Sequence, residues 1–100
     1  MLNPYTEKKF ELGRVVCTPG VHHLIESGKI SKDWLLHFVE RHQHGDWGDH
    51  VCAEDEAVNE EALILGHRLF SSYIVVDTQR MWVITEADRS VTTLLLPREY

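Results

Sequence analysis

The sequence contains few of the residues that mark specialised chains. Its 100 residues include only 2 cysteines, 3 prolines and 6 glycines. These are too few for a disulfide scaffold, a collagen-like repeat or a proline-rich disordered segment. No apolar run approaches the roughly 18 residues of a bilayer-spanning helix, and residues 1–9 lack the apolar core of a secretory signal. We therefore expect a cytoplasmic protein without membrane contact, in which Cys17 and Cys52 are small buried thiols.

Basic residues are also scarce. The chain has 10 Lys or Arg against 16 Asp or Glu, and its formal net charge is -6. Phosphate backbones repel such a chain, which disfavours dedicated nucleic-acid binding. Part of the acidic excess is concentrated in one segment, at Glu54, Asp55, Glu56, Glu60 and Glu61. This segment is either a solvated helix face or an acidic patch that engages a protein partner with a basic surface.

The apolar fraction of 43% is large enough for one small hydrophobic core. Residues 1–12 are polar and lack periodicity, so we expect a loosely ordered lead-in before a single domain over 13–100. Residues 13–17 are rich in β-branched side chains and predict a short strand. Thr18 and Pro19 then predict a helix start, and Gly28 its end.

Two further helices follow. Ser31 is a suitable N-cap for a helix that Gly45 ends, and the third helix covers about 53–65. In this third helix we expect Val58, Ala62 and Leu65 to face inward and the glutamates outward. The runs 69–76, 81–85 and 91–96 are strands joined by short turns, which predicts an antiparallel meander. The fold class is therefore α+β, with helices packed on one face of the sheet, and the place of the first strand is left open.

Metal binding is one alternative for the segment 42–52. It contains four soft or borderline ligands, His42, His44, His50 and Cys52. Zinc takes imidazole and thiolate ligands, but this spacing matches no standard zinc pattern. His42 also continues the apolar stripe of its helix, so a buried, hydrogen-bonded histidine is the other interpretation. We expect no cofactor.

The indole between two glycines, Trp47, also has two interpretations. It either folds back onto the core while Asp46 bonds the loop amides, or forms an exposed aromatic anchor at an interface. We favour the first interpretation, and keep Trp47 among the candidate binding residues with Asp88 and Arg89.

The hairpin around residues 85–93 suggests a catalytic alternative. A small ribonuclease needs a base and a cation for the phosphate, and Glu86 and Arg89 fit these roles, with His67 or His23 as the general acid. In the ordinary structural interpretation, Asp88 caps a turn and Arg89 pairs with Glu86.

Several of these segments also carry a resemblance. Arg41-His42, the Gly-Asp-Trp-Gly motif over 45–48 and the string WVITEADRSVTTLLLP over 82–97 resemble a family of small bacterial proteins labelled plasmid-related. The resemblance runs from about Leu12 to Tyr100. It implies a setting on plasmids and integrated elements, where small accessory proteins block host restriction or CRISPR machinery. It implies no catalytic residue, and its motif includes His42 but not the positions of His44 and His50.

Three functional hypotheses follow. The leading one is a non-enzymatic interaction protein of a mobile genetic element, which inhibits a host defence or nucleic-acid-processing complex. Its candidate binding residues are Glu54, Asp55, Glu60, Glu61, Trp47, Asp88 and Arg89. The alternatives are a ribonuclease-like toxin and a metal-binding regulator. A homodimer through an unpaired sheet edge is also possible.

Overall fold

The computed structural model describes residues 7–49 and 51–100. The elements, in chain order, are β1 (Arg14–Cys17), α1 (Pro19–Glu26), α2 (Lys32–Gln43), α3 (Ala53–Leu65), β2 (Leu69–Val76), β3 (Gln79–Thr85), β4 (Val91–Leu95) and the 3-10 helix η1 (Pro97–Glu99). The α+β class and the element order are thus confirmed. The candidate metal ligand His50 lies outside the described residues.

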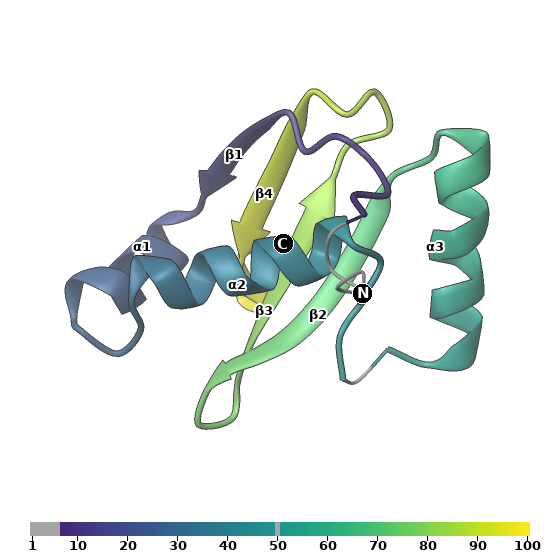
Figure 1. The fold of residues 1–100 in the computed structure, drawn as a ribbon. Helices are drawn as coiled ribbons and strands as arrows, with labels where there is room; N and C mark the ends of the chain where they lie inside the picture. Colours follow the sequence, from purple (N-terminus) through teal and green to yellow (C-terminus); the bar gives the residue numbers. More distant parts are fainter. Residues whose placement is uncertain (1–6, 50) are drawn as a thin grey trace.

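The four strands form one mixed sheet in the order β1-β4-β3-β2. The pairs β2–β3 and β3–β4 are antiparallel, which confirms the predicted meander. β1 pairs in parallel with β4, with Val15 opposite Thr92. A parallel pair needs a long connection, and here that connection contains all three helices and two strands. In Figure 1, β1 and β2 are the two outer strands of the sheet.

Helices α1 and α2 cover one face of the sheet, where the main core lies. α2 crosses in front of the strands in Figure 1. Its buried residues meet alternate residues of the strands, as the period of two requires. This cluster includes Val21, Leu24, Leu35, Phe38, Val39, Tyr73, Val75, Met81, Val83 and Leu94. The expected N-cap of α2 is present, because the Ser31 hydroxyl accepts a hydrogen bond from the Trp34 amide.

Helix α3 instead lies along the outer edge of β2. Its Asn59 side chain hydrogen-bonds both main-chain groups of Phe70, donating to the carbonyl at 2.6 Å and accepting from the amide at 3.0 Å. This contact turns Asn59 and Ala62 inward, and leaves Val58 and Leu65 exposed. The prediction that Val58 and Leu65 face the core was therefore wrong.

Two other expectations need correction. Cys17 and Cys52 are free thiols as expected, but both are exposed rather than buried. Thr18 is the N-cap of α1, yet its hydroxyl donates to Glu99 of η1 instead of capping the helix. The other carboxylate oxygen of Glu99 accepts from the Gly20 amide, so a residue from the far end of the chain caps α1.

The part of the lead-in that the structure describes is held to the domain by main-chain and side-chain hydrogen bonds. The Lys9 amide donates to the Gln43 carbonyl, and the Gln43 side chain donates to the Phe10 carbonyl. The Thr92 hydroxyl donates to the Leu12 carbonyl at 2.7 Å. Residues 9, 10 and 12 are therefore hydrogen-bonded to the domain, while residues 1–6 lie outside the described residues, and the loose ordering of the lead-in as a whole stays a prediction.

Candidate functional site

A chain of buried polar side chains crosses the interface between α2 and the sheet. His42 is fully buried, with its Nδ1 atom 2.5 Å from the Ser71 hydroxyl and its Nε2 atom 2.9 Å from the Thr85 hydroxyl. The Thr85 hydroxyl is in turn 2.7 Å from the hydroxyl of Thr92. Both ring nitrogens therefore have partners, as a buried imidazole requires. The interpretation of His42 as a buried, hydrogen-bonded histidine is confirmed.

Burial, with a smaller contribution from the positive charge of Arg89, lowers the pKa of His42 to about 3. The imidazole is thus neutral at physiological pH and is sealed from solvent. Neither ring nitrogen has a free lone pair for a metal ion, and the described residues contain no group of three or more potential metal ligands. His42 therefore does not belong to the proposed ligand set, and the His44 ring instead contacts the Glu40 carbonyl.

The loop that follows α2 is shaped by Arg41 and Asp46. The Arg41 guanidinium forms a two-pronged ion pair with Asp46, at 2.7 and 3.2 Å. Asp46 also accepts from the Gly48 amide, which confirms its expected role in the loop. Trp47 folds back onto the core and is buried, and its indole nitrogen donates to Glu60. The favoured interpretation of Trp47 is therefore confirmed, and the alternative of an exposed binding anchor is wrong, because its ring fills the space between the loop, Phe10 and α3.

At the hairpin tip, Arg89 contacts the C-terminal end of α3. The Arg89 guanidinium donates to the main-chain carbonyls of Ala62 and His67, at 3.2 and 2.6 Å, and to that of Glu86 at 3.1 Å. The bonds to Ala62 and His67 place the Arg89 charge at the C-terminal end of α3, where a cation is favourable. Among the described residues no ion pair joins Arg89 to the Glu86 carboxylate, so that expected pair was wrong.

This geometry bears on the catalytic alternative. Arg89 is occupied by carbonyl oxygens, and Asp88 accepts from the amide and hydroxyl of Ser90, which is the expected turn cap. These Ser90 bonds lower the pKa of Asp88. His23 lies on α1, at the opposite end of β4 from the hairpin (Figure 1). The contacts thus favour the structural interpretation of the hairpin, and the roles of Glu86 and His67 as base and acid stay predictions.

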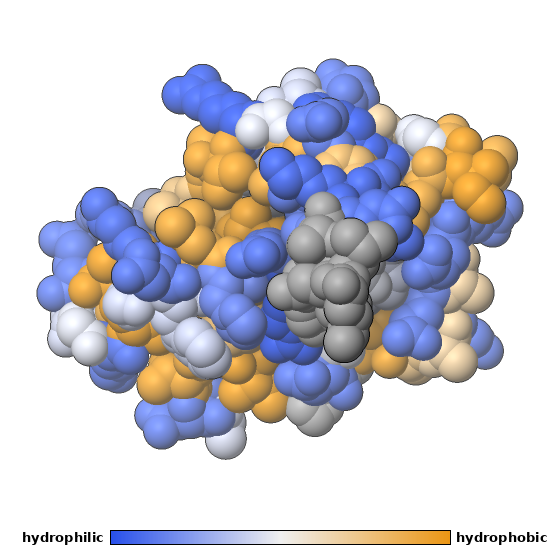
Figure 2. Space-filling view, in the orientation of Figure 1, coloured by the Kyte–Doolittle hydropathy of each residue, from blue (hydrophilic) through white to orange (hydrophobic). Residues whose placement is uncertain are grey.

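The exposed side of α3 combines acidic and apolar side chains. The exposed fractions are 61% for Val58, 84% for Ile64 and 56% for Leu65. Val58 and Leu65 are seven residues apart, as are Ala57 and Ile64, so the two pairs form adjacent lines on the helix. Glu61 lies between these lines. Figure 2 shows hydrophobic surface over the C-terminal end of α3. We call this surface, which consists of Glu54, Ala57, Val58, Glu61, Ile64 and Leu65, the α3 face.

The acidic residues of α3 form no ion pair with the residues that the structure describes. Glu60 accepts the hydrogen bond from the Trp47 indole. For the other acidic residues of the helix, the described part of the chain supplies no ion-pair partner. The sequence analysis identified these acids, but it placed Val58 and Leu65 in the core and did not consider Ile64. The signal in the sequence that could have found them is Asn59. A polar residue that hydrogen-bonds the sheet turns its own side of the helix inward and the opposite side toward solvent.

Comparison with protein-family models, with curated proteins and with solved structures finds no match to this chain.

Proposed function

We propose that the chain is a non-enzymatic interaction protein whose α3 face binds a basic surface of a protein partner. The exposed apolar side chains within an acidic helix are the observation that carries this proposal. Ile64, Leu65 and Val58 lose solvent contact when a partner covers them, which supplies the apolar centre of an interface. The surrounding carboxylates supply the charged rim, which selects a partner surface of positive charge and raises the rate of association.

The same charge pattern argues against two other occupants of the α3 face. A second copy of the chain would bring two acidic helices together, and like charges at an interface are strongly unfavourable. A nucleic acid or an anionic membrane surface would be repelled in the same way. A basic protein surface remains, and in nucleic-acid-processing complexes such surfaces hold the phosphate backbone.

The biological part of the proposal is that the partner is a host-defence complex of the restriction or CRISPR type, or another nucleic-acid-processing complex. An acidic helix on its basic surface would compete with nucleic acid and inhibit it. The acidic α3 face supports this competition. The resemblance to plasmid-related proteins supports the setting, a mobile genetic element in a bacterial cytoplasm.

The test combines affinity purification from a bacterial lysate with binding measurements on the purified partner. We expect Ile64→Ser and Glu61→Lys each to weaken binding about tenfold or more, as central interface residues do. Raising the salt concentration to ~0.5 M should weaken it further, because the exposed charges are then screened. Glu11→Lys, at an exposed acid outside α3, is the matched control and should change binding little.

The variants are chosen to leave the fold intact. Glu60 is kept, because it holds the Trp47 indole, and each variant is checked by thermal unfolding. Recovery of no partner at endogenous protein levels would overturn the proposal. So would a partner whose affinity is unchanged by Ile64→Ser and Glu61→Lys.

A further inference from the structure

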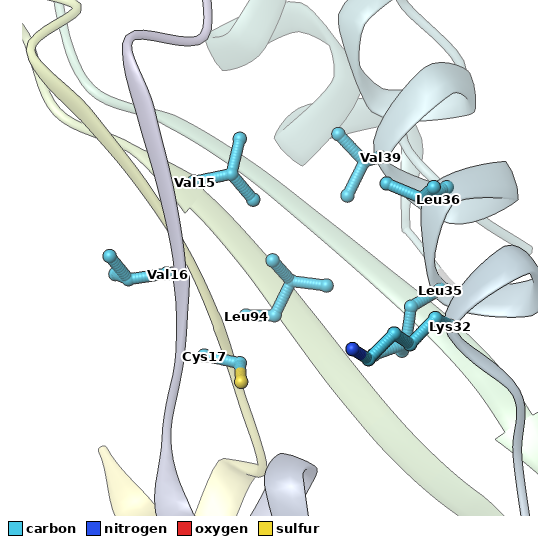
Figure 3. A pocket seen from close by; sticks show the side chains of 8 residues that line it. All are labelled: Val15, Val16, Cys17, Lys32, Leu35, Leu36, Val39 and Leu94. Carbon is cyan, nitrogen blue, oxygen red and sulfur yellow. The ribbon is translucent and has the colours of Figure 1, made fainter. Parts of the chain in front are cut away.

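A second surface, on the opposite side of the molecule from α3, is an apolar groove between β1 and α2. The groove has a volume of about 290 Å³. Figure 3 shows Val15, Cys17 and Leu94 facing the side chains of α2 across it. The residues that line it are Val15, Val16, Cys17, Lys32, Leu35, Leu36, Val39 and Leu94. We call this surface the β1 groove, and its only charged lining residue is Lys32.

The strand beside the groove has an unpaired edge. The Arg14 amide donates to the carbonyl of Ser90, directly before β4, and the Thr18 amide donates to the carbonyl of Leu94 in β4. Because main-chain groups alternate in direction along a strand, those of Val15 and Cys17 point away from β4. Within the described residues, no hydrogen bond reaches these outward groups. The edge therefore offers two amides and two carbonyls to a further strand.

The opposite edge of the sheet, on β2, differs from β1 because hydrogen bonds from other parts of the fold cover it. On β2, Asn59 bonds Phe70, and the Ser72 amide donates to the Trp47 carbonyl. The Trp34 indole donates to the Val75 carbonyl at 2.8 Å. The residues that the structure describes thus cover β2 with side chains and a loop, and none of them hydrogen-bonds the outer edge of β1, which lies beside exposed apolar side chains. Leu36 is 59% exposed and Val15 43%.

The chemistry of the groove specifies its occupant. Outward main-chain groups are satisfied by an extended backbone, whose alternate side chains then point into the adjacent groove. The apolar lining accepts aliphatic side chains. Lys32 has no ion-pair partner among the described residues, and Figure 3 shows its ammonium at the Cys17 end of the groove. A carboxylate at that end of the added strand would pair with it.

A second copy of this chain fits less well. If two β1 strands paired, each groove would receive side chains of the other strand. β1 consists of Arg14, Val15, Val16 and Cys17, so it contains an arginine and no acid. Lys32 would then stay unpaired, with a further positive charge nearby. The charge pattern therefore favours a different chain.

We propose that β1 and the β1 groove bind an extended segment of a partner protein by adding it to the sheet as an antiparallel fifth strand. Antiparallel pairing gives straighter hydrogen bonds than parallel pairing. In that direction the partner residue opposite Cys17, near Lys32, comes two positions before the residue opposite Val15, and both side chains point into the β1 groove. The recognised pattern is therefore an acidic residue followed two positions later by an aliphatic residue.

Cys17 makes the proposal directly measurable. The variant Cys52→Ser leaves Cys17 as the one remaining thiol of the chain. The probe is a synthetic pentapeptide, Glu-Thr-Val-Thr-Val, with an acetylated N-terminus and an amidated C-terminus. At saturating probe, alkylation of Cys17 by iodoacetamide should slow about tenfold, and the amide NMR signals of Val15 and Cys17 should shift. Probe with lysine in place of glutamate should bind about three- to fivefold more weakly.

Variants of the protein separate the contribution of the β1 edge from that of the Lys32 charge. Val15→Pro removes one outward amide without touching the β1–β4 bonds, and should abolish protection. Lys32→Glu should reverse the preference between the two probes, and tests the groove if Val15→Pro fails to fold. Leu65→Ser, on the α3 face, should leave protection unchanged, so this result is independent of the proposed function of α3.

Three outcomes would overturn the proposal. One is unchanged alkylation and unchanged amide signals at probe concentrations up to the millimolar range. Another is equal binding of the probe by Lys32→Glu and the unaltered protein. The third is a homodimer, measured by light scattering, that Val15→Pro converts to a monomer, because the occupant would then be a second copy.

Discussion

Acidification should destabilise this protein well above the pH at which most carboxylates titrate, and His42 is the reason. Its pKa in the folded protein is about 3, against an ordinary value of 6.5 in the unfolded chain. Between these two values the unfolded state binds one more proton than the folded state. The free energy of unfolding therefore falls as the pH falls below 6.5, by up to about 1.4 kcal/mol per pH unit.

The expected loss between pH 7 and pH 5 is about 2 kcal/mol. For a domain of this size it corresponds to a fall in melting temperature of roughly 8–16 °C. The range stops at pH 5 because hydrogen bonds also lower the pKa values of Asp88 and Glu99. A lowered carboxylate pKa stabilises the fold at higher pH, and that stabilisation is lost only below the ordinary values of 3.8 and 4.5.

The assay is urea unfolding at a series of pH values, for the unaltered protein and for His42→Gln. The glutamine amide does not titrate, yet it provides polar atoms for Ser71 and Thr85. We expect His42→Gln to be less stable at pH 7 by about 1–3 kcal/mol, because the imidazole bonds are replaced by poorer ones. Its loss of stability on acidification should be smaller by about 2 kcal/mol. Equal pH dependence of the two proteins, or a His42 imidazole that titrates near pH 6.5 by NMR, would refute the reasoning.

Three substitutions test how the tertiary contacts hold α3 and its loop. Gly48→Ala should cost more than about 3 kcal/mol in thermal unfolding, because φ is +112° and a Cβ atom would lie 1.8 Å from the Ser72 carbonyl oxygen; a melting temperature within a few degrees of the parent would contradict this close approach. Asn59→Ala should cost about 1–3 kcal/mol and speed amide hydrogen exchange in α3, since Phe70 loses both main-chain bonds; unchanged exchange would show that other contacts hold the helix. Arg89→Ala should cost about 1.5–3 kcal/mol and fray the last turn of α3; an Arg89→Ala variant with parental stability would return Arg89 to the catalytic alternative.

The secondary structure could be predicted from the sequence because its signals are local. The Ser31 hydroxyl and the Asp88 carboxylate each accept a hydrogen bond from an amide a few residues away. The glycines at 45 and 48 allow the positive φ angles of their loop. The aromatic and β-branched residues of the run 69–76 predict a strand, which is β2. Even the burial of His42 follows from its place in an apolar stripe. The candidate site was predicted only in part, as an acidic segment without its apolar residues.

What the sequence determined by itself was therefore the α+β class, the order of the elements, most of their boundaries and the acidic character of α3. Tertiary structure alone decided the parallel pairing of β1 with β4, the rotation of α3 about its axis and the exposure of both cysteines. These features depend on contacts between distant segments. The Leu12 carbonyl and the Thr92 hydroxyl are 80 residues apart, and Thr18 and Glu99 are 81 apart. No local pattern encodes such pairs, because their energies depend on the packing of the whole chain.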